Sequence, residues 1–180
     1  MRTFIALKTL PFEEELFAIE TSYKEIISDV SWVGCDNLHV TVKFLGEIDA
    51  KILIDVGNML QIIAEKQSPF NFSISGVSGF PVSSNARVLF FRIDDGYHTI
   101  SSLMKEVSLS LTKFGFEEEK SYVPHITFAR AKRSPVNLDK IAFERFTIQS
   151  KATGLIIMKS DLSRGEPVYS VVSEFDFFGK

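Results

Sequence analysis

A short pattern occurs twice in the 180-residue chain and restricts the folds that the chain can adopt. Residues 37–45 read NLHVTVKFL and residues 123–130 read VPHITFAR, so a histidine, an aliphatic residue and a threonine recur within an apolar run. The two histidines, His39 and His125, are 86 positions apart, which is close to half the chain. One His-x-Thr match is common by chance, but two on predicted strands at half-chain spacing indicate two similar lobes around a shared cleft.

Strand geometry places the repeated histidines and threonines where they could act together in catalysis. Successive side chains of a strand alternate between its faces, so His39 and Thr41 share one face, as do His125 and Thr127. If the two strands face each other, two imidazoles and two hydroxyls converge. With an ordinary pKa near 6.5, one histidine can be a base while the other is an acid, and threonine hydroxyls can donate to phosphate oxygens. The pattern therefore favours metal-independent cleavage of a phosphodiester by water.

Structural explanations compete with this interpretation for each residue. A lone strand histidine is more often structural, and threonine is common in strands because of its β propensity; the pairing of the motifs favours function. His98 lies beside a turn at a predicted helix start and is given no role. Lys43 is predicted on the face of His39, where it either adds positive charge or is a solvated lysine at the strand end.

Periodicity predicts an α+β fold of mostly antiparallel sheet with outer helices, in one domain of two lobes over residues 1–180. Asp49 is a plausible N-cap of the second helix, and Gly165, Glu166 and Pro167 form a predicted turn. The predicted helices are Phe12–Asp29, Ala50–Lys66, Thr99–Phe114 and a short one at Leu138–Glu144. The predicted strands are Thr3–Leu7, Leu38–Leu45, Phe70–Ser78, Ala86–Ile93, Tyr122–Ala129, Phe146–Met158 and Val168–Phe177.

Composition excludes several classes of protein. The net charge of −3 argues against a protein that coats long nucleic acid. The single cysteine, Cys35, allows neither an intrachain disulfide nor a thiolate metal site, and no third ligand accompanies the histidine pair for a catalytic zinc. No phosphate-binding loop or dinucleotide fingerprint is present. With neither a signal peptide nor a membrane span in the sequence, we expect a cytoplasmic monomer that needs no cofactor or metal.

Four segments together resemble a known family. They are RTFIAL at residues 2–7, WVGCDNLHVTVKFLGE at 32–47, YVPHITFAR at 122–130 and SDLSRGEPVY at 160–169. They are similar to the bacterial and archaeal RNA 2′,3′-cyclic phosphodiesterases, also called the 2′-5′ RNA ligase family, of the two-histidine phosphoesterase superfamily. The resemblance implies a bilobal α+β fold with a central cleft and hydrolysis of a 2′,3′-cyclic phosphate to a 2′-phosphate end.

The resemblance also assigns roles to individual residues. It implies that His39 and His125 are catalytic and that Thr41 and Thr127 bind phosphate. We assign His39 as the acid that protonates the departing 3′ oxygen and His125 as the base that activates water.

The second motif also contains Arg130, which the resemblance implies helps to bind phosphate. Strict alternation places Arg130 on the face opposite His125. It reaches the site only if the strand ends or bulges near Ala129, or through the length of its side chain; otherwise it is a surface arginine.

The sequence leaves the substrate and two other activities open. RNA 3′ ends and small cyclic nucleotides are both possible substrates. The same histidines could join tRNA half-molecules through a 2′-5′ bond, with an RNA 5′-hydroxyl in place of water. A non-catalytic module that binds RNA ends is the third alternative, although a pure binder needs no acid–base pair.

Overall fold

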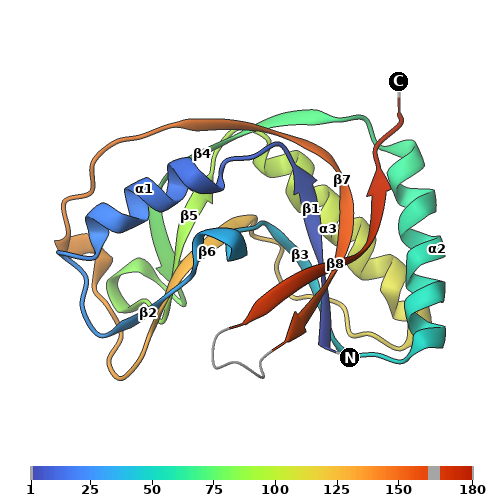
Figure 1. The fold of residues 1–180 in the computed structure, drawn as a ribbon, viewed down its shortest axis with the longest axis horizontal. Helices are drawn as coiled ribbons and strands as arrows, with labels where there is room; N and C mark the ends of the chain where they lie inside the picture. The colour runs from blue at the N-terminus through green and yellow to red at the C-terminus, as the bar shows by residue number, and fades with distance from the viewer. Residues whose placement is uncertain (1, 162–166, 180) are drawn as a thin grey trace.

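A single eight-stranded antiparallel sheet forms the centre of the protein (Figure 1). The computed structural model describes residues 2–161 and 167–179, so the predicted turn at Gly165 and Glu166 lies outside the described residues. The strands run in the order β2-β6-β5-β4-β7-β1-β3, and β8 also pairs with β7. They are β1 (Arg2–Thr9), β2 (Val30–Trp32), β3 (Thr41–Glu47), β4 (Phe70–Phe80), β5 (Val88–Ile93), β6 (His125–Ala131), β7 (Ile148–Asp161) and β8 (Val168–Asp176). The helices are α1 (Glu13–Tyr23), α2 (Ala50–Lys66) and α3 (Tyr97–Leu111), and together these elements confirm the predicted α+β class.

The sheet has two parts, each with its own helices (Figure 1). One part contains β1, β3, β7 and β8 and is covered by α2 and α3, and the other contains β2, β5 and β6 and is covered by α1. Strand β4 joins them, because residues 70–74 pair with β7 and residues 74–80 pair with β5. The two motif strands, β3 and β6, therefore belong to different parts of the sheet.

The helices are exchanged between the two halves of the chain. The ring of Tyr23 in α1 lies 6.4 Å from that of Phe91 in β5 and 6.0 Å from that of Phe128 in β6. Helix α3, from the second half of the chain, packs on β3 of the first half. Each motif strand is therefore backed by the helix of the other half, and the two lobes are not consecutive halves of the sequence.

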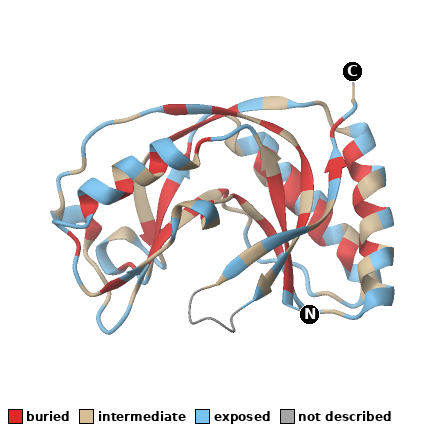
Figure 2. Cartoon of the chain, in the orientation of Figure 1, coloured by how far each residue is buried: buried red, intermediate tan, exposed pale blue. Residues whose placement is uncertain are grey.

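The core lies between the sheet and its helices, as the buried residues in Figure 2 show. Helix α2 illustrates how the sequence produces this packing. Its predicted bounds are confirmed, and Asp49 Oδ1 accepts a hydrogen bond from the backbone N–H of Ile52 at 2.8 Å, as expected of an N-cap. Val56, Leu60 and Ile63 recur at helical spacing and are buried, so one apolar stripe fixes the helix on the sheet.

Two predicted helices are wrong in length. Helix α1 ends at Tyr23 instead of Asp29; residues 24–26 form a turn, and Asp29 adopts a left-handed φ of 57° just before β2. Residues 138–144 form only the 3₁₀ turn Leu138–Lys140. Beyond this turn the exposure alternates from residue to residue, as in extended chain, and no continuous apolar stripe supports a longer helix.

The motif strands begin later than predicted. Strand β3 starts at Thr41 rather than Leu38, so His39 lies just before the strand. Strand β6 starts at His125 rather than Tyr122. In the described residues, no helix combines the length and apolar character needed to cross a membrane.

Candidate active site

One backbone bridge brings the two motifs together. Val40 and Ile126 form an isolated antiparallel bridge, and both side chains are fully buried on the core face. Alternation then places the residues on either side of each bridge partner on the opposite face. His39, Thr41, His125 and Thr127 therefore gather on one face, as expected if the two motif strands meet, and each is half-buried.

The two histidines are oriented in the same way. Nδ1–H of His39 donates to the carbonyl of Asn37 at 2.6 Å, and Nδ1–H of His125 donates to the carbonyl of Val123 at 2.7 Å. A carbonyl can only accept, so Nδ1 carries the proton in both neutral rings. Nε2 is then the nitrogen that can accept or deliver a proton at the site.

Aromatic rings surround His39. The ring of Phe4 stacks on it at 4.8 Å, and the ring of Tyr169 meets it edge-on at 5.3 Å. Thr41 Oγ1 lies 2.9 Å from His39 Nε2 and donates to it in the neutral tautomer. Tyr169 could not be predicted as a site residue, because it lies 130 positions beyond His39 and no local pattern links the two.

His125 has a similar apolar setting. The rings of Phe80 and Phe90 each lie 5.0 Å from the imidazole. Strand β5 aligns Phe90 with Thr127 and Arg92 with His125. Directly opposed residues of an antiparallel pair share a face, so Arg92 belongs to the same face as the motif residues.

Burial disfavours the protonated form of both histidines. The pKa of His39 is lowered from 6.5 to about 4, chiefly because burial desolvates the ring, with smaller contributions from the charges of His125 and Arg130. Desolvation also lowers the pKa of His125, and Arg130 adds to this shift. The carbonyls of Asn37 and Val123 oppose these shifts because they stabilise the protonated rings. Both imidazoles are therefore neutral at neutral pH in the free protein.

A β-bulge places Arg130 on the same face of the sheet as the motif residues. Strand β5 pairs Leu89 with Ala129 and then Phe90 with Thr127, so Phe128 is an extra residue in β6. Phe128 and Ala129 are consecutive and both fully buried, which breaks the alternation. Arg130 thus returns to the face of Thr127, and its charge acts on both histidines.

A second bulge corrects the prediction for Lys43. Strand β1 pairs Ile5 with Lys43 and then Ala6 with Thr41, so Val42 is the extra residue and Lys43 turns away from the site. Lys43 is buried and its Nζ lies 2.7 Å from Glu119 Oε1 and 2.8 Å from the carbonyl of Glu117. It is neither a charge at the site nor a solvated lysine.

The second bulge brings Phe44 to the site face instead. Phe44 is 61% exposed, and its ring lies 5.9 Å from that of Phe4. Phe44 is thus the counterpart of Arg130, three residues after the motif threonine. The described residues contain no group of three His, Cys, Asp or Glu side chains arranged to hold a metal ion.

Solved structures share this fold. The protein TT0787 of Thermus thermophilus superposes with a TM-score of 0.82 at 26% identity over all of both chains. Escherichia coli LigT in complex with 3′-AMP superposes with a TM-score of 0.80 at 21% identity over 98% of this chain and 97% of LigT. A further structure described as a phosphoesterase superposes with a TM-score of 0.78 at 22% identity over 98% of each chain. The fold is thus one that phosphoesterases adopt.

Sequence comparison gives the family. Residues 10–90 match the family model described as LigT like Phosphoesterase. The RNA 2′,3′-cyclic phosphodiesterase of Aquifex aeolicus is 31% identical over 80% of each chain, and that of Methanocaldococcus jannaschii is 29% identical over 97% of this chain and all of its own. The chain belongs to the LigT-like phosphoesterase family, as the resemblance of its motifs predicted. It is therefore an enzyme of the hydrolase class.

Proposed function

We propose that this enzyme opens 2′,3′-cyclic phosphates on RNA ends and leaves a 2′-phosphate, with His39 and His125 as a metal-independent acid–base pair. The observation that carries the proposal is the Val40–Ile126 bridge, which gathers both His-x-Thr segments on one face. The curated relatives carry the name of this activity, which supports RNA as the substrate.

The geometry supports a defined sequence of proton transfers. Water attacks the phosphorus, and Nε2 of His125 takes a proton from this water. The bond from phosphorus to O3′ breaks, and Nε2–H of His39 gives its proton to O3′. A histidine whose pKa is strongly lowered releases its proton readily, which suits His39 to the acid role.

The remaining motif residues hold the phosphate in this proposal. The hydroxyls of Thr41 and Thr127 donate to non-bridging oxygens, and Arg130 supplies a charge-assisted contact. The negative charge of the bound phosphate favours the imidazolium form, so His39 takes up its proton as substrate binds.

Product analysis tests the proposed function. A short RNA that ends in a 2′,3′-cyclic phosphate is incubated with the enzyme and EDTA, and the products are separated and mapped. We expect a 2′-phosphate end. A 3′-phosphate product, or activity that EDTA abolishes and added metal restores, contradicts the proposal. A parallel reaction with an RNA that carries a 5′-hydroxyl shows whether 2′-5′ joining competes with hydrolysis.

The lowered histidine pKa values predict an acidic pH optimum. In the active form of the free enzyme, one histidine of the pair is protonated and the other is neutral. The value of kcat/KM therefore peaks midway between the two macroscopic pKa values. Because burial lowers the pKa of both His39 and His125, this midpoint lies below 6.5. The bound phosphate raises both values, so kcat peaks at a higher pH than kcat/KM. Initial rates in overlapping buffers test this, and a kcat/KM optimum above 6.5 contradicts it.

A further inference from the structure

Strand β1 carries an exposed arginine, Arg2, at the edge of the site. The bulge at this end of the β1–β3 pair lies in β3, at Leu45, so β1 itself is regular. Arg2 and Phe4 therefore share a face of β1 and are separated by about 7 Å along the strand. The ring of Phe4 stacks on His39 at 4.8 Å and meets that of Tyr169 at 5.0 Å. Arg2 thus lies on the site face, beyond the aromatic rings around His39.

The charge of Arg2 acts on a residue of the site. Burial raises the pKa of the Tyr169 phenol, and the positive charges of Arg130 and Arg2 oppose this shift. The Tyr169 ring in turn meets that of His39 edge-on at 5.3 Å. Tyr169 therefore lies within the fields of two arginines, of which only Arg130 is assigned to the reacting phosphate.

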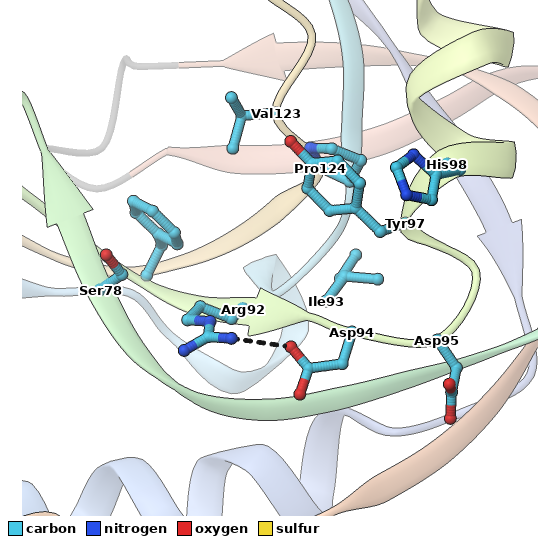
Figure 3. Close-up of a pocket in the computed structure, with 10 residues that line it drawn as sticks. Ser78, Arg92, Ile93, Asp94, Asp95, Tyr97, His98, Val123 and Pro124 are labelled. Atoms are coloured by element: carbon cyan, nitrogen blue, oxygen red, sulfur yellow. Dashed lines mark hydrogen bonds and ion pairs between the residues drawn. The ribbon is translucent and has the colours of Figure 1, made fainter.

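A third arginine of the site face, Arg92, is already paired. Arg92 Nη2 lies 3.1 Å from Asp94 Oδ1, and Figure 3 shows this pair in the wall of a pocket. The other carboxylate oxygen of Asp94 accepts a hydrogen bond from Ser75 Oγ. Among the described residues, Arg2 takes part in no ion pair or side-chain hydrogen bond, and Glu47, its cross-strand partner in β3, is also exposed. The charge of Arg2 is therefore available to a ligand.

The proposed reaction places the rest of the substrate on the side of Arg2. O3′ departs at Nε2 of His39, so the terminal ribose lies toward His39 and the attacking water toward His125. An RNA that ends in a cyclic phosphate continues only from O5′ of that ribose. Its next phosphate is therefore one ribose away from the reacting phosphate, on the side where Arg2 extends the site. A cyclic mononucleotide has no phosphate at this position.

We infer that Arg2 binds the phosphodiester on the 5′ side of the terminal nucleotide and makes the enzyme prefer RNA ends to cyclic mononucleotides. The inference rests on the proposed function, because that function sets the terminal ribose at His39. A guanidinium suits this partner, since it is always charged and can donate two parallel N–H bonds to phosphate oxygens. Because Arg2 is exposed, salt should weaken the contact.

Two substrates that differ by one phosphodiester test the inference. One is adenosine 2′,3′-cyclic phosphate, and the other carries a methyl phosphodiester on its O5′. The wild-type enzyme should have the higher kcat/KM for the second substrate. We expect Arg2→Gln to lower kcat/KM for the second substrate about 3- to 10-fold at low salt, mainly through KM, and to leave the first unchanged. Arg2→Lys keeps the charge and should retain most of the preference.

Lys159→Gln is the matched control. Lys159 is exposed and is the cross-strand partner of Thr3, so it carries a positive charge at the same end of the sheet but on the opposite face from Arg2. This variant should change neither rate. A wild type without the preference, an equal effect of Arg2→Gln on both substrates, or the same selective loss in Lys159→Gln overturns the inference.

A binding measurement separates this inference from the proposed function. If the wild-type enzyme hydrolyses neither substrate, the proposed function fails. Calorimetric binding of adenosine 2′-phosphate, with and without the methyl phosphodiester on O5′, then applies the same comparison of variants to Arg2 alone. Tighter binding of the second product by the wild type but not by Arg2→Gln supports the inference, and equal binding of both products by the wild type overturns it.

Discussion

Replacement of either His39 or His125 by glutamine is expected to lower kcat for an RNA 2′,3′-cyclic phosphate by about 10²- to 10⁴-fold. Glutamine is polar, but its amide can neither take a proton from water nor give one to O3′. KM should change much less, because the proposal assigns phosphate binding to Thr41, Thr127 and Arg130, which the variants leave in place. Single-turnover rates on a short RNA substrate measure the loss.

The double variant shows whether the histidines act as one unit. Groups that work together in one transition state lose activity non-additively, so the double variant should be about as slow as the slower single variant. Thermal unfolding of each protein checks that the fold is intact, which matters because His39 also packs against Phe4 and Tyr169. Near-wild-type turnover by a folded single variant would show that this pair is not the catalytic pair.

Replacement of Arg130 by glutamine is expected to lower kcat/KM by about 10- to 150-fold. A hydrogen bond to a charged group contributes about 1.5–3 kcal/mol, which corresponds to this range. Arg133→Gln is the matched control, because Arg133 lies three residues further along and its Nε contacts Asp29 Oδ1 at 3.2 Å, on the surface. Kinetics on the same cyclic phosphate compare the two variants, and equal effects would assign Arg130 to the surface.

Arg130 also has a signature in the pH profile that a purely structural residue lacks. After burial, its positive charge is among the causes that lower the pKa of both histidines. Arg130→Gln should therefore raise both pKa values and move the kcat/KM optimum to higher pH. Arg130→Lys keeps the charge and should keep the optimum, while it loses the planar fork that binds phosphate. An unchanged optimum in the glutamine variant would contradict this assignment.

Local patterns predicted the elements that depend on neighbours in sequence. Helix α2 has its predicted bounds because a capping aspartate, Asp49, precedes a stripe of apolar residues at helical spacing. The His-x-Thr pairs lie on one face because alternation across two residues survives in any strand. The prediction for Lys43 was wrong because it assumed a regular strand. A bulge in β3 reverses the faces of the residues that follow the bulge.

The fold class, the family and the two His-x-Thr motifs could thus be predicted from local patterns. How the two halves of the chain combine depends on the tertiary structure. It backs β3 with α3 and β6 with α1, brings Tyr169 of β8 to His39, and returns Arg130 to the site through the bulge at Phe128. It also sets the histidine pKa values through burial. The physical reason is that strand pairing and desolvation depend on residues far apart in the chain, which no local pattern records.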